Sequence, residues 1–192
     1  QLLADAGIHV VFISTNLVFD GSLQFPKTTD LVNPVNEYAR QKLMVEEYLS
    51  ANVPKSAIIR FSKVLEPNHP LLLGWLRKLD SSQRIYPYSN KKIAPVSSDT
   101  AAGILTWIIK NKKTGFYHAS SSSEFSYADI ANHLAKMIGL NQSLISPIKT
   151  FIGDISPSSF STLETSDEIT SCFGPLKLQR ALDPIIEFYK NQ

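Results

Sequence analysis

The stretch VFISTNLVFDG, residues 11–21, joins an apolar run to a polar triplet and then turns apolar again. The run at residues 9–13 is short and almost continuously apolar, which is typical of a strand in a parallel sheet covered on both faces. Ser14, Thr15 and Asn16 follow it directly. Ligands of open α/β sheets bind beyond the carboxyl ends of the strands. The polar triplet is therefore predicted to lie at the edge of a binding site.

The segments after this stretch predict a strand–helix–strand unit. Asn33 can cap a helix and Pro34 suits a first helical turn, so a helix is expected from there to about residue 51. The next strand is expected at residues 57–61, and the crossover should be right-handed. The connection at residues 14–33 exceeds the ~12–15 residues beyond which loops in compact domains are usually functional or disordered. Its large apolar side chains argue against disorder.

The rest of the chain continues the alternation of helices and strands, which predicts an α/β architecture. Residues 84–98 and 141–161 predict irregular chain with short extended pieces. A strand is expected at 115–119. One helix should follow a cap at Ser98 or Asp99, and another should run over 127–138 between a Ser126 cap and a Gly139 stop. Further helices are expected at 71–79, 166–173 and 178–190.

Composition and charge narrow the class of protein. The chain has 192 residues, of which 43% are hydrophobic, and this fits one domain or one domain with a small lobe. A net charge of +2 gives no support to a surface for nucleic acid or an anionic membrane. Apolar runs fall short of the ~18 residues of a transmembrane helix. The single cysteine, Cys172, is compatible with a reducing compartment, so a cytoplasmic protein is expected. The dispersed histidines predict no metal site.

The predicted helix after residue 34 carries a lysine within an apolar pattern. Five residues recur at helical spacing and predict one core-facing stripe. They are Val35, Tyr38, Lys42, Val45 and Leu49. In one reading, Lys42 extends to solvent or pairs with Glu46 one turn later. In the other reading, its ammonium lies beside the phenol of Tyr38, lowers the pKa of that phenol from ~10, and prepares it to exchange a proton with a carbonyl or hydroxyl group.

Several segments together resemble a known family. They are STNLVFDG at residues 14–21, NPVNEYARQKLMVEE at 33–47 and IIRFSKV at 58–64, with weaker matches at 93–104 and 114–131. In this order and spacing the chain resembles the extended short-chain dehydrogenase/reductase superfamily. More narrowly, it is similar to the dTDP-4-dehydrorhamnose reductase group of nucleotide-sugar reductases. The resemblance covers most of the chain.

The resemblance implies reduction of a nucleotide-linked 4-keto-sugar with NADP or NAD as cofactor. Tyr38 matches the tyrosine that protonates the keto oxygen, Lys42 matches the lysine that holds the nicotinamide ribose, and Thr15 matches the hydroxyl that hydrogen-bonds the reacting oxygen. The remaining matches are Ser14, Arg60 and Ser62 near the cofactor, and Asn16, Val18, Phe19 and Pro95 near the sugar. For Arg60 the residues leave a second reading open, in which its charge reaches solvent or a carboxylate.

The resemblance also has departures. The family's phosphate-binding Gly-rich turn is absent, since the eight glycines are scattered. Residues 1–7 predict the last turns of a helix ended by Gly7, so the chain is expected to be the later part of a longer protein. Asn16 replaces a frequent acidic residue, which leaves the sugar contact open, and Ala39 replaces a frequent glycine.

The expected architecture is the C-terminal part of a Rossmann-like, doubly wound parallel sheet with a small α/β substrate-binding lobe. Residues 1–65 should complete the Rossmann-like domain, and residues 66–192 should form mainly the lobe, with interleaved elements of the sheet. Three alternatives stay open: a non-catalytic nucleotide-sugar-binding or regulatory subunit, a partial chain without activity, and an epimerase or dehydratase of the same superfamily. A homodimer is a further expectation.

Overall fold

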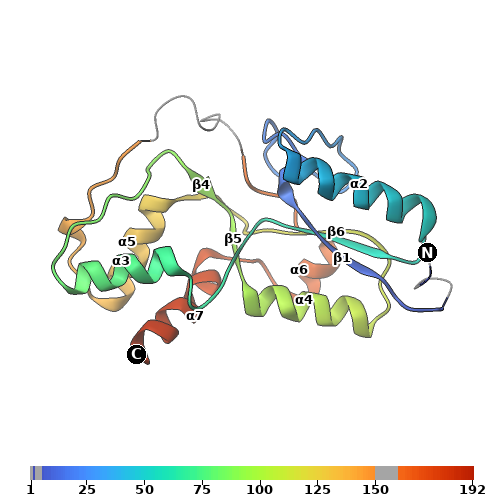
Figure 1. The fold of residues 1–192 in the computed structure, drawn as a ribbon. Coiled ribbons are helices and arrows are strands. Elements are labelled where there is room, and N and C mark those ends of the chain that lie inside the picture. The colour runs from blue at the N-terminus through green and yellow to red at the C-terminus, as the bar shows by residue number, and fades with distance from the viewer. Residues whose placement is uncertain (1, 3–5, 150–159) are drawn as a thin grey trace.

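A three-stranded parallel sheet forms the centre of the first lobe (Figure 1). The computed structural model describes residue 2, residues 6–149 and residues 160–192, so most of the expected helix at residues 1–7 lies outside the described residues. The sheet has the order β1-β2-β6, with α2 on one face and α4 and α6 on the other. These elements are β1 (Val11–Thr15), α2 (Glu37–Asn52), β2 (Ala57–Phe61), α4 (Ser98–Lys110), β6 (Gly115–Ala119) and α6 (Asp167–Phe173). The predicted α/β class and Rossmann-like parallel sheet are confirmed.

The first strand lies two residues later in the chain than the sequence predicts. β1 covers Val11–Thr15, so Ser14 and Thr15 belong to the strand and do not follow it. Parallel pairing with β2 extends the strand, because Ser14 lies opposite Arg60 and Thr15 lies opposite Phe61. Arg60 in turn lies opposite His118 on β6. Neighbouring residues in such a register share one face of the sheet, so the sheet carries a polar row across all three strands.

Helix α2 begins later and turns a different face to the core than the sequence predicts. Its N-cap is Asn36, whose side chain accepts the backbone N–H of Ala39 at 2.9 Å, and not Asn33. Ala39, Glu46 and Leu49 are buried. Of the expected stripe, Leu49 is buried, whereas three members are exposed: Val35 by 66%, Tyr38 by 52% and Val45 by 39%. The stripe was wrong because a glutamate, and not an apolar residue, occupies the core-facing position one turn after Lys42.

The second lobe packs three helices around one apolar core, supported by a short antiparallel pair (Figure 1). Its elements are α3 (Pro70–Asp80), β4 (Lys92–Ile93), β7 (Phe125–Ser126), α5 (Tyr127–Ile138), the 3-10 helix η2 (Gln142–Leu144) and α7 (Leu178–Lys190). Between the lobes, β3 (Lys63–Leu65) and β5 (Pro95–Ser97) form a separate parallel pair. The strand β3 was not anticipated. After α3 in the second lobe, the chain returns to the first lobe, where α4, β6 and α6 belong to the sheet and its covering layer.

The helix caps show where local sequence signals were sufficient. Helix α5 has the predicted bounds, the predicted Ser126 cap and the predicted Gly139 stop, which adopts a left-handed conformation with a φ of 83°. Helix α4 is instead capped by Ser97, whose hydroxyl accepts the N–H of Thr100 at 3.2 Å. Three consecutive residues can each cap a helix here, and the sequence alone did not rank them.

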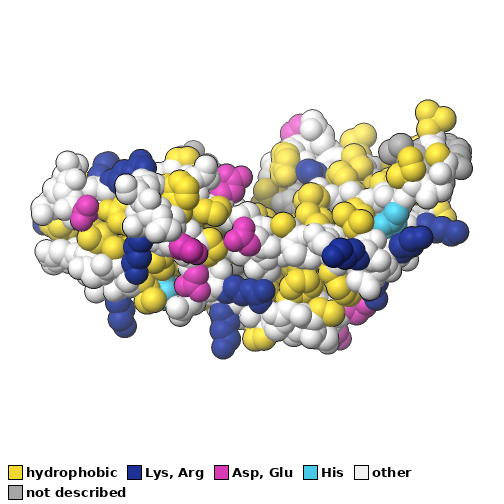
Figure 2. Space-filling view, turned by 90° about the horizontal axis from the view of Figure 1, so that it is seen from below, with side chains coloured by type: hydrophobic (Ala, Val, Ile, Leu, Met, Phe, Trp, Pro, Cys, Tyr) yellow, Lys and Arg dark blue, Asp and Glu magenta, His cyan; other side chains and the backbone are white. Residues whose placement is uncertain are grey.

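The surface gives no single-sign charge patch on the face seen from below. Figure 2 shows acidic and basic side chains lying among apolar ones on both lobes. Within the described part of the chain, no helix combines the length and the apolar character needed to cross a membrane.

The α5 cap provides a test of the fold. Ser126 accepts the N–H of Asp129 at 3.0 Å, and the Asp129 carboxylate accepts the N–H of Ser126 at 2.8 Å. We expect Ser126→Ala to lower the unfolding free energy by about 1 kcal/mol, measured by urea denaturation, because the backbone N–H of Asp129 loses its acceptor, the Ser126 hydroxyl. Ser143→Ala, at an exposed position of η2, is the control. Equal midpoints for the two variants would contradict this assignment.

Candidate functional site

The carboxyl end of β1 is held by a cap made by its own last residue. Thr15 caps the 3-10 helix η1 (Asn16–Val18), and its Oγ1 accepts the backbone N–H of Leu17 at 3.2 Å. The turn directs Val18 and Phe19 inward, with exposed fractions of 0% and 8%, and leaves Leu17 outside. Val18 and Phe19 pack with Leu163. Neither side chain forms the open wall that the predicted sugar contact requires, because the short helix rotates them into the core.

Lys42 ties helix α2 to the same strand end. Its Nζ donates to the carbonyl oxygen of Ile13 at 2.8 Å. The same nitrogen lies 5.8 Å from the centre of the Tyr38 ring and 4.9 Å from the centre of the Phe12 ring. Tyr38 is half exposed and therefore accessible to a ligand. The structure thus brings Tyr38 and Lys42 to the strand that carries Ser14 and Thr15.

Glu46 does not pair with Lys42, because it forms a buried ion pair with Arg60. The guanidinium donates from Nε to Oε1 at 3.0 Å and from Nη2 to Oε2 at 2.6 Å. Arg60 is 3% exposed and Glu46 is 1% exposed. Two parallel hydrogen bonds of this kind fix both the distance and the orientation of the two groups. The pair therefore fixes the rotation of α2 about its axis relative to β2.

His118 supports Arg60 from the neighbouring strand. Its Nε2 lies 3.2 Å from Nη1 of Arg60, and its Nδ1 lies 3.2 Å from the carbonyl oxygen of Pro26. Since arginine can only donate, Nε2 accepts and Nδ1 carries the proton that is donated to Pro26. Burial and the nearby charge of Arg60 lower the pKa of His118 to about 3. The neutral imidazole thus links the sheet to the loop after β1.

Arg60 and Ser62 are both engaged inside the protein. Arg60 takes the reading that the sequence left open, in which its charge reaches a carboxylate. Its guanidinium is also enclosed by two rings, with Cζ 5.1 Å from the Phe19 ring centre and 4.9 Å from that of Phe116. The hydroxyl of Ser62 donates to the carbonyl oxygen of Ala94. A cofactor contact of Arg60 or Ser62 would have to compete with these partners, and it stays a prediction.

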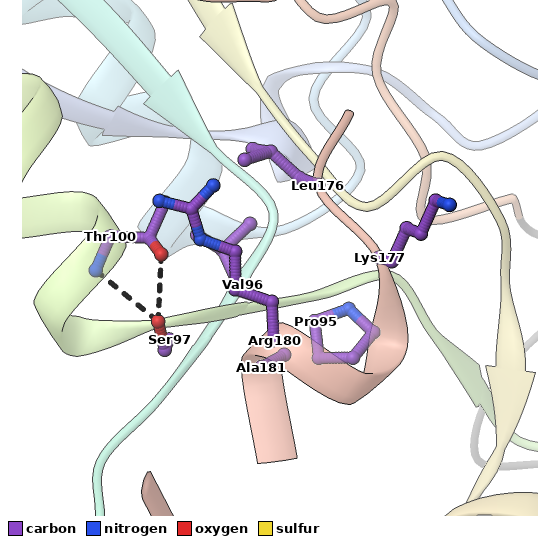
Figure 3. Close-up of a pocket in the computed structure, with 8 residues that line it drawn as sticks. All are labelled: Pro95, Val96, Ser97, Thr100, Leu176, Lys177, Arg180 and Ala181. Atoms are coloured by element: carbon purple, nitrogen blue, oxygen red, sulfur yellow. Dashed lines mark hydrogen bonds between the residues drawn. The ribbon is translucent and has the colours of Figure 1, made fainter. Parts of the chain in front are cut away.

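Pro95 lies near Ser62, since β3 pairs Lys63 with Pro95, and it lines a narrow hollow between the lobes. Figure 3 shows this hollow, with Arg180 extending toward Thr100. Its lining comes from β5, α4 and the segment entering α7, and consists of Pro95, Val96, Ser97, Thr100, Leu176, Lys177, Arg180 and Ala181. The hollow does not admit a water molecule. The predicted contact of Pro95 with a sugar therefore gains no support from this geometry.

The loop after η1 is closed by Asp20. Its carboxylate accepts the N–H of Ser22 at 2.8 Å and the side-chain amide of Asn33 at 3.0 Å. These hydrogen bonds, first those of Ser22 and then that of Asn33, lower the pKa of Asp20 to about 2. Asn33 thereby ties the far end of the loop to its beginning, and this explains why Asn33 is not the cap of α2.

Several residues of the site were not singled out by the sequence. Glu46 entered only as an alternative partner of Lys42, and His118 only as one of the dispersed histidines. Their buried positions follow from pairing between segments far apart in the chain. Glu124 and Ser161 were not singled out: Ser161 ends the stretch 141–161 that was expected to be irregular, and Glu124 lies between the strand predicted at 115–119 and the helix predicted at 127–138. Among the described residues, no group of three or more metal-ligating side chains is found.

The comparison with known families finds one family model that covers nearly the whole chain. The family model described as the RmlD substrate binding domain matches residues 1–186. The chain belongs to this family. The match covers both lobes, including the segments at 93–104 and 114–131 that resembled the family more weakly.

Curated relatives carry reductase names. A dTDP-4-dehydrorhamnose reductase of Sinorhizobium fredii is 27% identical over 147 residues, which are 70% of this chain and 50% of the relative. One from Salmonella typhimurium is 29% identical over 134 residues, which are 66% of this chain and 45% of the relative. The chain thus spans about half the length of the curated relatives it matches.

Solved structures share the fold. A dTDP-4-dehydrorhamnose reductase from Bacillus anthracis in complex with NADP has a TM-score of 0.80 at 17% identity, covering 99% of this chain and 67% of that one. A dTDP-glucose 4,6-dehydratase from the same organism has a TM-score of 0.79 at 12% identity, covering 100% and 65%. At these identities the similarity establishes the fold, and the fold alone does not separate the two reactions.

The neutral state of His118 predicts how stability depends on pH. Its pKa is about 3 in the folded protein against 6.5 for an ordinary histidine, so below pH 6.5 the unfolded chain binds a proton that the folded protein refuses. We expect the unfolding free energy to fall by up to about 1.4 kcal/mol per pH unit between pH 6.5 and 3 from this group. His118→Asn should lack this component. Identical pH slopes for variant and parent, measured by urea denaturation, would contradict the assignment.

Proposed function

We propose that the protein reduces the keto group of a nucleotide-linked 4-keto-sugar, with NADH or NADPH as the hydride donor. The observation that carries this proposal is the bond from Lys42 to the carbonyl of Ile13, which holds the Tyr38–Lys42 helix against the strand end with Ser14 and Thr15. The names of the curated relatives support the reductase class. The NADP in the Bacillus anthracis reductase supports the cofactor.

The residues at this strand end fit a bound nicotinamide nucleotide. The hydroxyl of Ser14 is buried and has no hydrogen-bond partner among the described residues, although buried polar groups are normally paired. It shares the polar row with Arg60, on the face that α2 covers. An ammonium has three N–H donors, and Lys42 gives one of them to Ile13, so two are left for ribose hydroxyls. We assign Ser14, Tyr38 and Lys42 to cofactor binding.

The proposed chemistry at the substrate is protonation of a keto oxygen. The bound nicotinamide supplies the hydride that reaches the carbonyl carbon. Tyr38 gives its phenolic proton to the oxygen, so that the keto group becomes a secondary alcohol. Thr15 accepts the N–H of Leu17, and its hydroxyl donates to Oδ1 of Asn16 over a long 3.4 Å. Because a hydroxyl proton can rotate, the same proton would be turned to the keto oxygen when the sugar is bound. The charge of Lys42, near the ring of Tyr38, stabilises the phenolate that remains.

The reductase is preferred over the epimerase or dehydratase alternatives because the curated relatives are named as reductases. Asn16 belongs to the proposed sugar contact, since it follows Thr15 directly and is only partly buried. A cytoplasmic location and a homodimer remain predictions of the sequence. A non-catalytic sugar-nucleotide-binding role is the outcome that the following experiment distinguishes from catalysis.

Replacement of the Tyr38 hydroxyl tests the proposal. In the full natural protein with NADPH and a dTDP-4-keto-sugar, we expect Tyr38→Phe to lower kcat by about 10²- to 10⁴-fold, because the proton donor is lost. Affinity for NADPH should stay nearly the same, since Lys42 remains. The rate is followed by NADPH absorbance.

Tyr48→Phe is the matched control, because Tyr48 lies on the same helix and is 49% exposed. An unchanged kcat in Tyr38→Phe would exclude the assigned proton donor. Binding of the dTDP-sugar without any NADPH oxidation by the parent protein would support the binding role and refute the reductase.

A further inference from the structure

Residues 160–166 cross the loop that follows β1 and hold it to the sheet. The N–H of Phe160 donates to the carbonyl of Gly21 at 2.8 Å, and the N–H of Glu164 donates to that of Pro26 at 3.0 Å. Between them, Leu163 is 1% exposed and packs against Val18 and Phe19. The segment continues to β6, where the N–H of Ser166 donates to the carbonyl of His118 at 3.0 Å. It therefore spans the distance from the proposed site to the far strand of the sheet.

Asn16 is oriented by this segment. Its side-chain amide donates from Nδ2 to the carbonyl oxygen of Ser161 at 3.0 Å. The opposite end of the same carboxamide, Oδ1, therefore faces Thr15, whose Oγ1 lies 3.4 Å away. The position of the Ser161 carbonyl thus determines which atom of Asn16 is presented to the Thr15 hydroxyl.

Glu124 fixes Ser161 from the second lobe. It lies between β6 and β7, and its Oε1 accepts both the backbone N–H of Ser161 and, at 3.2 Å, the hydroxyl of Ser161. Glu124 and Ser161 are both partly buried, where charged hydrogen bonds are stronger than in water. A continuous chain of contacts leads from Glu124 through Ser161 and Asn16 to Thr15.

The residue type at position 16 decides whether this chain can form. A carboxamide donates to a carbonyl oxygen, whereas a carboxylate only accepts and would repel it. The link to Ser161 therefore requires a side-chain donor such as the Asn16 amide, and the acidic residue that the family resemblance leads us to expect at this position would break it.

We propose that Glu124 and Asn16 are positioning residues that couple the second lobe to the Thr15 end of the site and so set the affinity for the sugar. Glu124 holds Ser161, the Ser161 carbonyl orients Asn16, and Asn16 presents its Oδ1 beside the hydroxyl that contacts the keto oxygen. The kinetic part of this proposal rests on the proposed reductase function. The structural part does not, because it concerns hydrogen bonds present without substrate.

Truncation and conservative replacement of Glu124 separate positioning from general stability. We expect Glu124→Ala to raise the KM for the dTDP-4-keto-sugar about tenfold, the effect of losing about one charged hydrogen bond, while kcat changes less. Glu124→Gln should stay close to the parent, because its amide oxygen still accepts from Ser161. Glu164→Ala is the control, since Glu164 is an exposed carboxylate of the same segment. A glutamine variant as impaired as the alanine variant, or an unchanged KM in Glu124→Ala, would overturn the proposal.

Amide hydrogen exchange provides a readout that does not need turnover. We expect Glu124→Ala and Asn16→Asp each to speed exchange at the amides of Phe160 and Ser161 about tenfold, while the amides of β2 stay protected. The double variant should add little to either single one, because both remove the same chain of contacts. The coupling would be overturned if the effects of the two single variants on the exchange rates added fully in the double variant. It would also be overturned if the single variants exchanged at the rate of the parent. Absence of turnover in the parent would refute the reductase while leaving this result decisive for the coupling.

Discussion

The ion pair between Glu46 and Arg60 lies at the junction of α2 and the sheet, and the rest of the site depends on it. Both side chains are almost completely buried, so neither charge is solvated by water. Removing one partner of such a pair leaves an uncompensated buried charge and typically costs about 3–5 kcal/mol. The structure therefore requires both residues together. Because Glu46 lies one turn after Lys42, the pair also fixes the face of α2 that reaches β1.

The surroundings of Arg60 provide a partner for Nη1, the guanidinium nitrogen that does not contact Glu46. His118 accepts from Nη1, and the rings of Phe19 and Phe116 enclose the guanidinium carbon. A buried polar network is favourable only when its members are paired, and here the last member, His118, reaches the carbonyl of Pro26. The same charge that orients the helix thus also orients the loop after β1. Helix α2, strands β2 and β6, and the loop after β1 are thus held together by four polar groups, which are the side chains of Glu46, Arg60 and His118 and the carbonyl of Pro26.

Local signals predicted the elements whose ends are set by neighbouring residues. Strands β2 and β6 and helix α5 were predicted with their observed bounds, since apolar runs, the Ser126 cap and the Gly139 stop act within a few residues. The start of α2 and the position of β1 were predicted less well. Asn33 is used by Asp20, and Ser14 is drawn into the strand by pairing with β2, and both effects involve residues distant in sequence.

The sequence by itself determined the family, the order of elements, and the placement of Tyr38 and Lys42 four residues apart on one helix. Those properties follow from motifs and from periodicity within a few turns. Only the tertiary structure decided that Arg60 pairs with Glu46, that Val18 points inward, and that Asn16 meets Ser161 from 145 residues away. The physical reason is that buried polar groups must find partners, and the partners available are fixed by which distant segments the fold brings together.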